Sequence, residues 1–149
     1  MSTINYSGAV MSRESTLEQS YLVLVKFLML SKRRVFELGA GYGLTGMQAM
    51  MIFLLDAPRP MHSFKTIFNC DASNITGLVD GLEQKQLASR YEDLKDRRIK
   101  MVKLETKGRK VRTGLVKRSA TQDSPLLSKL NSAEMKTLIK LLQKVTAGE

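Results

Sequence analysis

The chain has 149 residues, 43% hydrophobic and 26% charged, with a formal net charge of +10. This length suits one compact domain, and no apolar run reaches the roughly 18 residues that a membrane span needs. The first residues lack the basic stretch and apolar core of a secretory signal, and a single cysteine excludes an internal disulfide. We therefore expect a cytoplasmic protein without membrane contacts.

The first long helix is expected to follow a loose arm over residues 1–14, which show no periodicity. Ser15 and Glu18 form the S-x-x-E pattern of a capping box, so we predict a helix from Ser15 to about Leu38, ended by GAGYG. Apolar residues cover much of its girth, which predicts more than one packing partner, including a second subunit.

The remaining elements follow from capping boxes, prolines and changes of period. Two further capping boxes join Thr45 to Gln48 and Asn131 to Glu134, and the prolines of DAPRP break the helix that the first one opens. The predicted elements are helices over residues 45–54, 63–69 and 73–86, short strands over 87–91 and 99–104, and helices over 106–119 and 131–145.

The positive charge is concentrated between Lys85 and Arg118, where thirteen Lys or Arg residues meet four Asp or Glu residues, a net charge of +9. This favours a polyanionic partner, because each neutralised phosphate releases condensed counterions. A solvated basic surface has the same composition, so the motifs must decide between the two.

Residues 63–104 have the order of a winged helix-turn-helix: a short helix, a polar turn, an amphipathic helix and a hairpin. The helix from Ser73 is expected to bury its aliphatic residues and to present small polar ones, which can approach base edges in the major groove. This outward set is Ser73, Asn74, Thr76, Gly77, Asp80 and Gly81. An ordinary amphipathic surface helix has the same pattern.

The hairpin tip distinguishes these interpretations, since Lys95, Arg97, Arg98 and Lys100 cluster there. Arginine on a projecting loop can enter a minor groove, where the potential is most negative. Asp96 is expected to pair with a neighbouring arginine and to stiffen the loop.

Three stretches, YGLTGMQAMMIFLL, NITGLVDGLEQKQLASR and DLKDRRIKMVKLETKGRKV, resemble the MarR family of bacterial transcriptional regulators. The resemblance covers residues 15–145 and implies a mainly α-helical fold of six helices with a small two-stranded antiparallel wing, one domain over 15–149. It implies a DNA-binding lobe over 45–104, and an intertwined homodimer base formed by helices over 15–38 and 106–145.

The pattern and the resemblance together assign roles to individual residues. The expected DNA contacts are Ser63, Ser73, Asn74, Thr76, Gly77, Lys95, Arg97, Arg98 and Lys100, with Arg98 in the minor groove. Wing support is expected from Asp80 and Asp96, and dimerisation from Leu17, Tyr21, Leu130, Leu138 and Leu142. Gly77 and Gly81 stand where many relatives have arginine, so base readout by this helix is expected to be thin.

The resemblance implies a sequence-specific transcriptional regulator that binds a pseudo-palindromic operator in double-stranded DNA. It implies a repressor, released by a small-molecule effector or an oxidant, in the cytoplasm of a bacterium or archaeon and associated with its nucleoid. The alternative is a nonspecific architectural DNA-binding protein. Gly77 and Gly81 leave this alternative open, because glycine has no side chain that could contact bases.

Other chemistry has little support in the sequence. VFELGAGYG resembles the glycine motif of S-adenosylmethionine-dependent methyltransferases, but that motif needs a strand where we expect a helix. Cys70 precedes a helix whose N-terminus could make a thiol oxidisable, although an inert, partly buried residue is the preferred interpretation. One histidine, His62, supplies no metal or catalytic arrangement. We therefore predict no enzyme activity, metal or cofactor.

Overall fold

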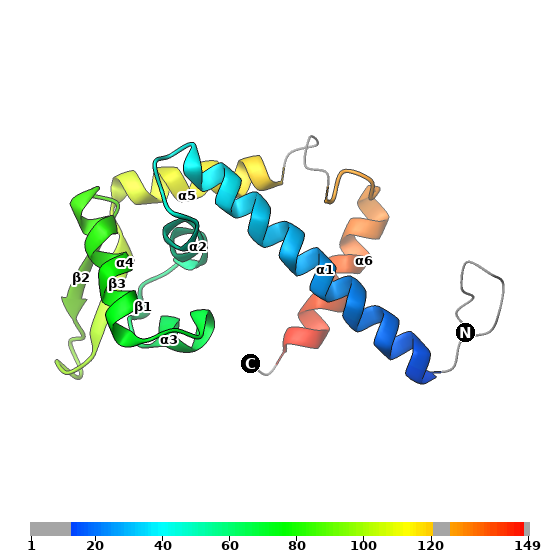
Figure 1. Ribbon diagram of the computed structural model, residues 1–149, viewed down its shortest axis with the longest axis horizontal. Helices are drawn as coiled ribbons and strands as arrows, with labels where there is room; N and C mark the ends of the chain where they lie inside the picture. The colour runs from blue at the N-terminus through cyan, green and yellow to red at the C-terminus, as the bar shows by residue number, and fades with distance from the viewer. Residues whose placement is uncertain (1–12, 121–125, 148–149) are drawn as a thin grey trace. The chain divides into compact units, whose positions relative to one another are not determined.

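The computed structural model describes residues 13–120 and 126–147 (Figure 1). It divides into two units, residues 1–33 and 34–149. The first unit holds most of helix α1 (Arg13–Ala40). The second holds the end of α1 and then α2 (Gly46–Leu54), β1 (Arg59–Pro60), α3 (Ser63–Phe68), α4 (Ala72–Gln84), β2 (Ala88–Glu92), β3 (Lys100–Leu104), α5 (Thr106–Ser119) and α6 (Ser132–Thr146). The predicted mainly α-helical winged helix, with six helices in the described residues, is confirmed.

Helix α1 begins at Arg13, two residues before the predicted start. Ser15 therefore lies inside the helix, and the expected capping box with Glu18 is wrong as a helix start. The glutamate in the first turn is Glu14, where a negative charge suits the positive end of the helix dipole. The predicted loose arm lies outside the described residues up to position 12, and its last two residues are helical.

The glycine segment after Val35 is helical up to Ala40, as expected, and no strand enters it. A Cβ on Gly39 would lie 2.4 Å from the Cβ of Ala49 in α2, so this glycine allows two helices to touch. The turn that follows has Gly43 at a φ of 67°, a conformation that favours glycine. The segment therefore serves helix packing rather than a nucleotide.

The capping box that opens α2 is confirmed. The amide of Gln48 donates to Thr45 Oγ1 and the amide of Thr45 donates to Gln48 Oε1, both at 3.2 Å. Gln48 is buried, and its Nε2 atom would lie 2.4 Å from a Cβ placed on Gly81. The prediction that Gly81 faces outward is therefore wrong, because α4 approaches α2 closely at this point.

The sheet has three antiparallel strands in the order β1-β3-β2, where the sequence predicted two. β2 and β3 form the predicted hairpin, with Tyr91 opposite Met101. The additional strand is β1, whose Pro60 also lies opposite Met101. Two residues that include a proline carry little strand signal, and proline is tolerated at this position because β1 is an edge strand.

One core joins α2, α3, α4, α5 and the sheet. Its largest fully buried side chains are Phe64, Met51, Ile52, Ile75, Leu82, Leu115, Val79 and Val102. At the start of α5 a Cβ on Gly108 would lie 1.9 Å from the carbonyl oxygen of Leu87, so helix and hairpin meet at backbone distance. This packing holds α5 close to the start of the hairpin.

Two helical segments bury little by themselves. All three buried residues of α1 belong to the second unit, whereas Leu17 and Tyr21 are 63% and 70% exposed. α6 has no buried residue, although its predicted capping box is present, with Asn131 Oδ1 accepting from the amide of Glu134 at 3.0 Å. No helix in the described ranges is long and apolar enough to cross a membrane.

Candidate nucleic-acid interface

Helices α3 and α4 are joined by a tight turn. Asn69 ends α3 in the left-handed conformation, with φ 47° and ψ 55°, which asparagine tolerates better than most residues. The amide of Cys70 donates to the carbonyl of Lys65 at 3.2 Å, and Asp71 is the extended N-cap residue of α4. The two helices thus form a helix-turn-helix, and α4 begins one residue before the predicted Ser73.

The outer face of α4 is small and polar. Ser73, Asn74, Thr76 and Gly77 are exposed, while the aliphatic residues between them are buried. The hydroxyl of Thr76 donates to the carbonyl of Ala72 at 3.0 Å, which leaves its oxygen free to accept. A Cβ on Gly77 would meet nothing within 4 Å. A partner could therefore approach this face as far as the helix backbone.

Arg90 in β2 ties the inner edge of α4 to the hairpin. Its Nε and Nη2 atoms donate to Glu83 Oε2 at 3.0 and 2.6 Å, and Nη2 also donates to Asp80. The Arg90 guanidinium lowers the pKa of the Glu83 carboxyl, and the two carboxylates raise the pKa of Arg90. Asp80, predicted to support the wing, thus bonds to a wing strand.

Sequence reasoning missed Arg90 and Glu83. The available signal was the i, i+3 spacing of Asp80 and Glu83 on α4, which places both carboxylates on one side of the helix. An arginine in the following strand, facing that helix, completes the cluster. The predicted residues were chosen for exposure, whereas this cluster is half-buried.

The wing tip, residues 93–99, is closed by its own hydrogen bonds. Asp96 accepts from Arg98 through Nε, Nη2 and the backbone amide, each at 3.0 Å. The Arg98 guanidinium therefore lowers the pKa of Asp96. Of the neighbouring arginines, it is Arg98 that pairs with the aspartate, and its side chain is still 90% exposed. Lys95 and Arg97 are also exposed.

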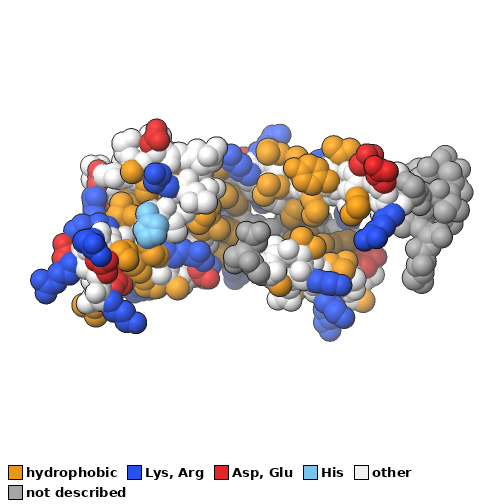
Figure 2. All heavy atoms as spheres, turned by 90° about the horizontal axis from the view of Figure 1, so that it is seen from below, with side chains coloured by type: hydrophobic (Ala, Val, Ile, Leu, Met, Phe, Trp, Pro, Cys, Tyr) orange, Lys and Arg blue, Asp and Glu red, His pale blue; other side chains and the backbone are white. Residues whose placement is uncertain are grey.

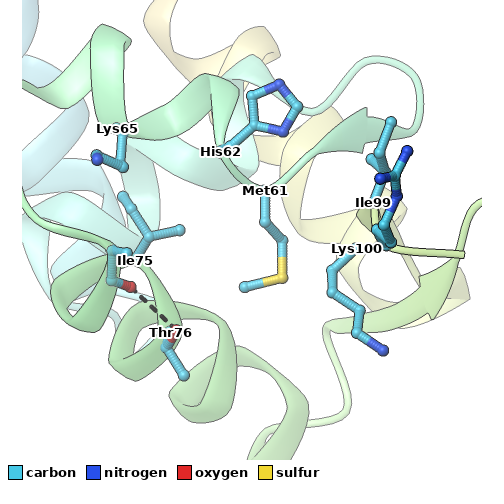
Figure 3. Close-up of a pocket in the computed structure, with 9 residues that line it drawn as sticks. Met61, His62, Lys65, Ile75, Thr76, Ile99 and Lys100 are labelled. Carbon is cyan, nitrogen blue, oxygen red and sulfur yellow. Dashed lines mark hydrogen bonds between the residues drawn. The ribbon is translucent and has the colours of Figure 1, made fainter. Parts of the chain in front are cut away.

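A cleft of about 260 Å³ lies between α3, α4 and the wing (Figure 3). It brings together three of the predicted DNA contacts, Thr76 from α4 and Arg98 and Lys100 from the wing. Sequence reasoning missed two residues of its wall, His62 and Lys65, and the side chain of Met61 points into the space between α4 and the wing (Figure 3). The full lining is Met61, His62, Lys65, Ala72, Ile75, Thr76, Arg98, Ile99 and Lys100.

A second, more open hollow lies beside the helix-turn-helix turn, where Asn74, Cys70 and Lys65 share a wall. Cys70 is a free, half-buried thiol. Ser63 lines neither hollow, because it is half-buried and its hydroxyl donates to the carbonyl of Pro60 at 2.7 Å. In the described ranges no cluster of three or more His, Cys, Asp or Glu residues could hold a metal ion.

Several cations surround the wing. Figure 2 shows Lys and Arg side chains at the end that carries the wing, at the left of the view, and others elsewhere on the visible face. Lys100 is partly compensated by Glu92, whose Oε1 lies 2.7 Å from the lysine Nζ, and Arg98 by Asp96. Lys65, Lys95 and Arg97 are also exposed, and Lys65 lines the same cleft as Arg98 and Lys100. The cleft is thus bordered by positive charge on both sides.

Comparison with known proteins finds similar solved structures. No protein-family model and no curated protein sequence matches the chain. The transcriptional regulator BldR from Sulfolobus solfataricus is 28% identical, with a TM-score of 0.67 over 90% of this chain and 99% of that one. The transcription regulator MarR from Oenococcus oeni PSU-1 is 27% identical, with a TM-score of 0.57 over 85% of this chain and 97% of that one.

A mutant MarR from E. coli, solved in complex with operator DNA, is 21% identical with a TM-score of 0.62, over 91% of this chain and 99% of that one. These structures share the fold of the present chain over 85–91% of its length. The resemblance predicted from three stretches of sequence is therefore confirmed, and the chain has the fold of the MarR-family winged helix regulators.

Proposed function

We propose that this chain is a DNA-binding transcriptional regulator that recognises a specific sequence as a homodimer. The observation that carries the proposal is the cleft in which Thr76 of α4 meets Arg98 and Lys100 of the wing. A helix face that can reach bases and a cationic tip that can reach phosphates thus line one cleft. The E. coli MarR complex with operator DNA, which has the same fold, supports this interpretation.

In the proposed complex, the outer face of α4 lies in the major groove and the wing tip enters the adjacent minor groove. Ser73 and Asn74 contact base edges or phosphates, and Gly77 lets the helix approach closely. Arg90 keeps the wing strand bonded to α4. The distance between the two groove contacts is therefore set before DNA binds, which lowers the entropic cost of the complex.

The proposed dimer base comprises residues 15–38 and 106–145, and the DNA-binding lobe residues 45–104. Leu17 and Tyr21 are mostly exposed, and Leu130, Leu138 and Leu142 are only half-buried. Apolar side chains in this number favour a second copy of the chain as their cover. A twofold dimer would present two copies of α4 to the two halves of a pseudo-palindromic operator.

The repressor role, and release by a small-molecule effector or an oxidant, are further parts of the proposal that rest on the family resemblance. An operator-binding protein of this kind would act on the chromosome of a bacterial or archaeal cell. None of these parts is needed for the DNA-binding test.

The test is competition between DNA fragments. A specific regulator retains fragments from its own upstream region and prefers them over bulk DNA by roughly a thousandfold or more. A nonspecific architectural protein, the alternative that Gly77 still supports, retains all fragments equally. Equal retention would refute sequence-specific regulation.

Two single substitutions separate the wing from α4. Arg98→Ala is expected to weaken binding to all sequences and to reduce the slope of log affinity against log salt by about one. Asn74→Ala is expected to change which bases are preferred and to leave that slope unchanged. Both are measured by fluorescence anisotropy across a salt series. An unchanged slope and affinity for Arg98→Ala would mean that the wing does not contact DNA.

A further inference from the structure

Leu94 is the most exposed of the large apolar side chains in the described part of the chain, with 98% of its surface accessible. It lies in the first half of the wing tip, between Asp93 and Lys95. Such a side chain contributes nothing to the core. Single exposed apolar residues are common on protein surfaces, so the significance of Leu94 depends on how the loop holds it and on what surrounds it.

The loop holds Leu94 at this position. Asp93 Oδ1 accepts hydrogen bonds from the backbone amides of Lys95 and Asp96, at 2.7 and 3.1 Å, which makes a local turn with Leu94 at its corner. The amide of Asp93 donates to the carbonyl of Ile99 at 3.0 Å, and the amide of Ile99 donates to the carbonyl of Asp96 at 2.9 Å. The backbone under Leu94 is therefore ordered before any partner arrives.

The surroundings of Leu94 are charged rather than apolar. Lys95 and Arg97 are exposed on the same tip, and the guanidinium of Arg98 extends beside them while bonded to Asp96. A protein-docking surface needs a contiguous apolar patch, which a lone leucine among cations does not supply. Duplex DNA does fit, because phosphates flank the minor groove and the faces of its base pairs are apolar.

We propose that Leu94 is a minor-groove wedge: when the wing enters the groove, this side chain inserts against a base step, partly unstacks it and bends the duplex. Apolar side chains inserted between base steps by minor-groove proteins act in this way. The inference rests on the proposed DNA-binding function and adds to it a source of specificity. Pyrimidine–purine steps unstack most easily, so the wedge favours operators that carry one where the wing lies.

This role would compensate for the small number of base contacts that α4 can make. Gly77 offers no side chain to the major groove, and Thr76 already donates its hydroxyl proton to Ala72. Base steps differ in how easily they deform, so insertion of Leu94 would favour some sequences over others at positions that no polar side chain contacts. The wing would then contribute charge through Arg98 and shape selectivity through Leu94.

The experiment uses the full chain and a duplex that the native protein retains, with 2-aminopurine placed in turn at each position of the flanks. Native protein is expected to raise the fluorescence at one flank step, because unstacking relieves quenching. Leu94→Ala is expected to abolish that rise and to weaken binding roughly tenfold, with an unchanged salt slope because no charge is removed. Leu94→Met, which keeps a long apolar side chain, is the matched control and is expected to retain the rise.

The outcomes distinguish the wedge from the proposed DNA-binding function on which it rests. If native protein retains no duplex, the proposed function fails and the wedge with it. If native protein binds specifically but no flank position responds, or if Leu94→Ala behaves like native protein, the wedge is refuted while the regulator stands. Thermal unfolding of each variant checks folding, and no change is expected because the side chain contacts no core residue.

Discussion

The two units of the chain use similar apolar residues in opposite ways. In the second unit Phe64, Ile75 and Val79 are at most 2% exposed, because helices and sheet close around them. In the first unit Leu17 and Tyr21 are more than 60% exposed on a helix that forms without a core of its own. The difference shows that composition alone does not determine burial. The lobe built from α2 to α5 and the sheet closes a core within the chain, whereas most of α1, like α6 at the end of the second unit, leaves apolar side chains without a cover.

The largest effect is expected at the exposed apolar face of α1, where the proposed contact with a second subunit would be lost. Leu17→Glu combined with Tyr21→Glu should convert a dimer into a monomer of 16.7 kDa. Burial of each such side chain is worth about 1.5–3 kcal/mol, and a twofold interface holds each residue twice. Sedimentation equilibrium measures the mass. Ile67→Glu, at a residue of α3 that is 47% exposed, is the control and should remain dimeric. A double variant that sediments like native protein would show that this face is not the interface.

The next largest effect is expected in the core of the second unit. Phe64→Ala should lower the free energy of unfolding by about 3–5 kcal/mol, since it removes a fully buried ring and leaves a cavity. The Phe64 ring lies 5.6 Å from that of Phe68, so an aromatic contact is lost as well. Urea denaturation in the monomeric double variant isolates this unit from dimerisation. Ile67→Ala, nearby but exposed, should change stability by less than about 0.5 kcal/mol. Similar losses for the two variants would contradict a closed core.

A smaller effect concerns the ion pair between α4 and the wing. The pKa of Glu83 is lowered from its ordinary 4.5 by Arg90, so the folded state favours the ionised carboxyl. Its contribution to stability is complete well above that value and is lost as the pH falls through the lowered pKa. Glu83→Gln should cost about 1 kcal/mol at neutral pH and flatten the acid side of the stability profile. Glu92→Gln, at the exposed pair with Lys100, should leave that profile nearly unchanged.

Periodicity and capping chemistry predicted most of the fold. Thr45 and Asn131 cap helices where their sequence partners indicated. Ser15 does not, because the S-x-x-E pattern also occurs within a helix that begins earlier, at Arg13. β1 was missed because two residues have no period, and only its register with β3 defines it. A capping pattern therefore identifies a helix start only where the residues before it are not already helical.

The candidate site was predicted less completely. Exposure and charge identified Thr76, Arg98 and Lys100, which line one cleft. Arg90 was missed because its role depends on a strand facing α4, which no local pattern reports. Leu94 was missed because a lone leucine in a polar loop resembles chance until its exposure is known. Residues that act through tertiary neighbours require the folded chain.

The two glycines of α4 differ in how well each position would tolerate a side chain. A side chain at Gly81 would collide with the terminal amide of Gln48, the capping-box partner of Thr45, so a change there would require this buried side chain to move. Gly77 borders open space, and a new side chain there would disturb nothing inside the protein while gaining helix propensity of up to about 1 kcal/mol. If α4 contacts DNA as proposed, a single substitution at Gly77 would change the surface presented to the bases without altering the packing of the fold.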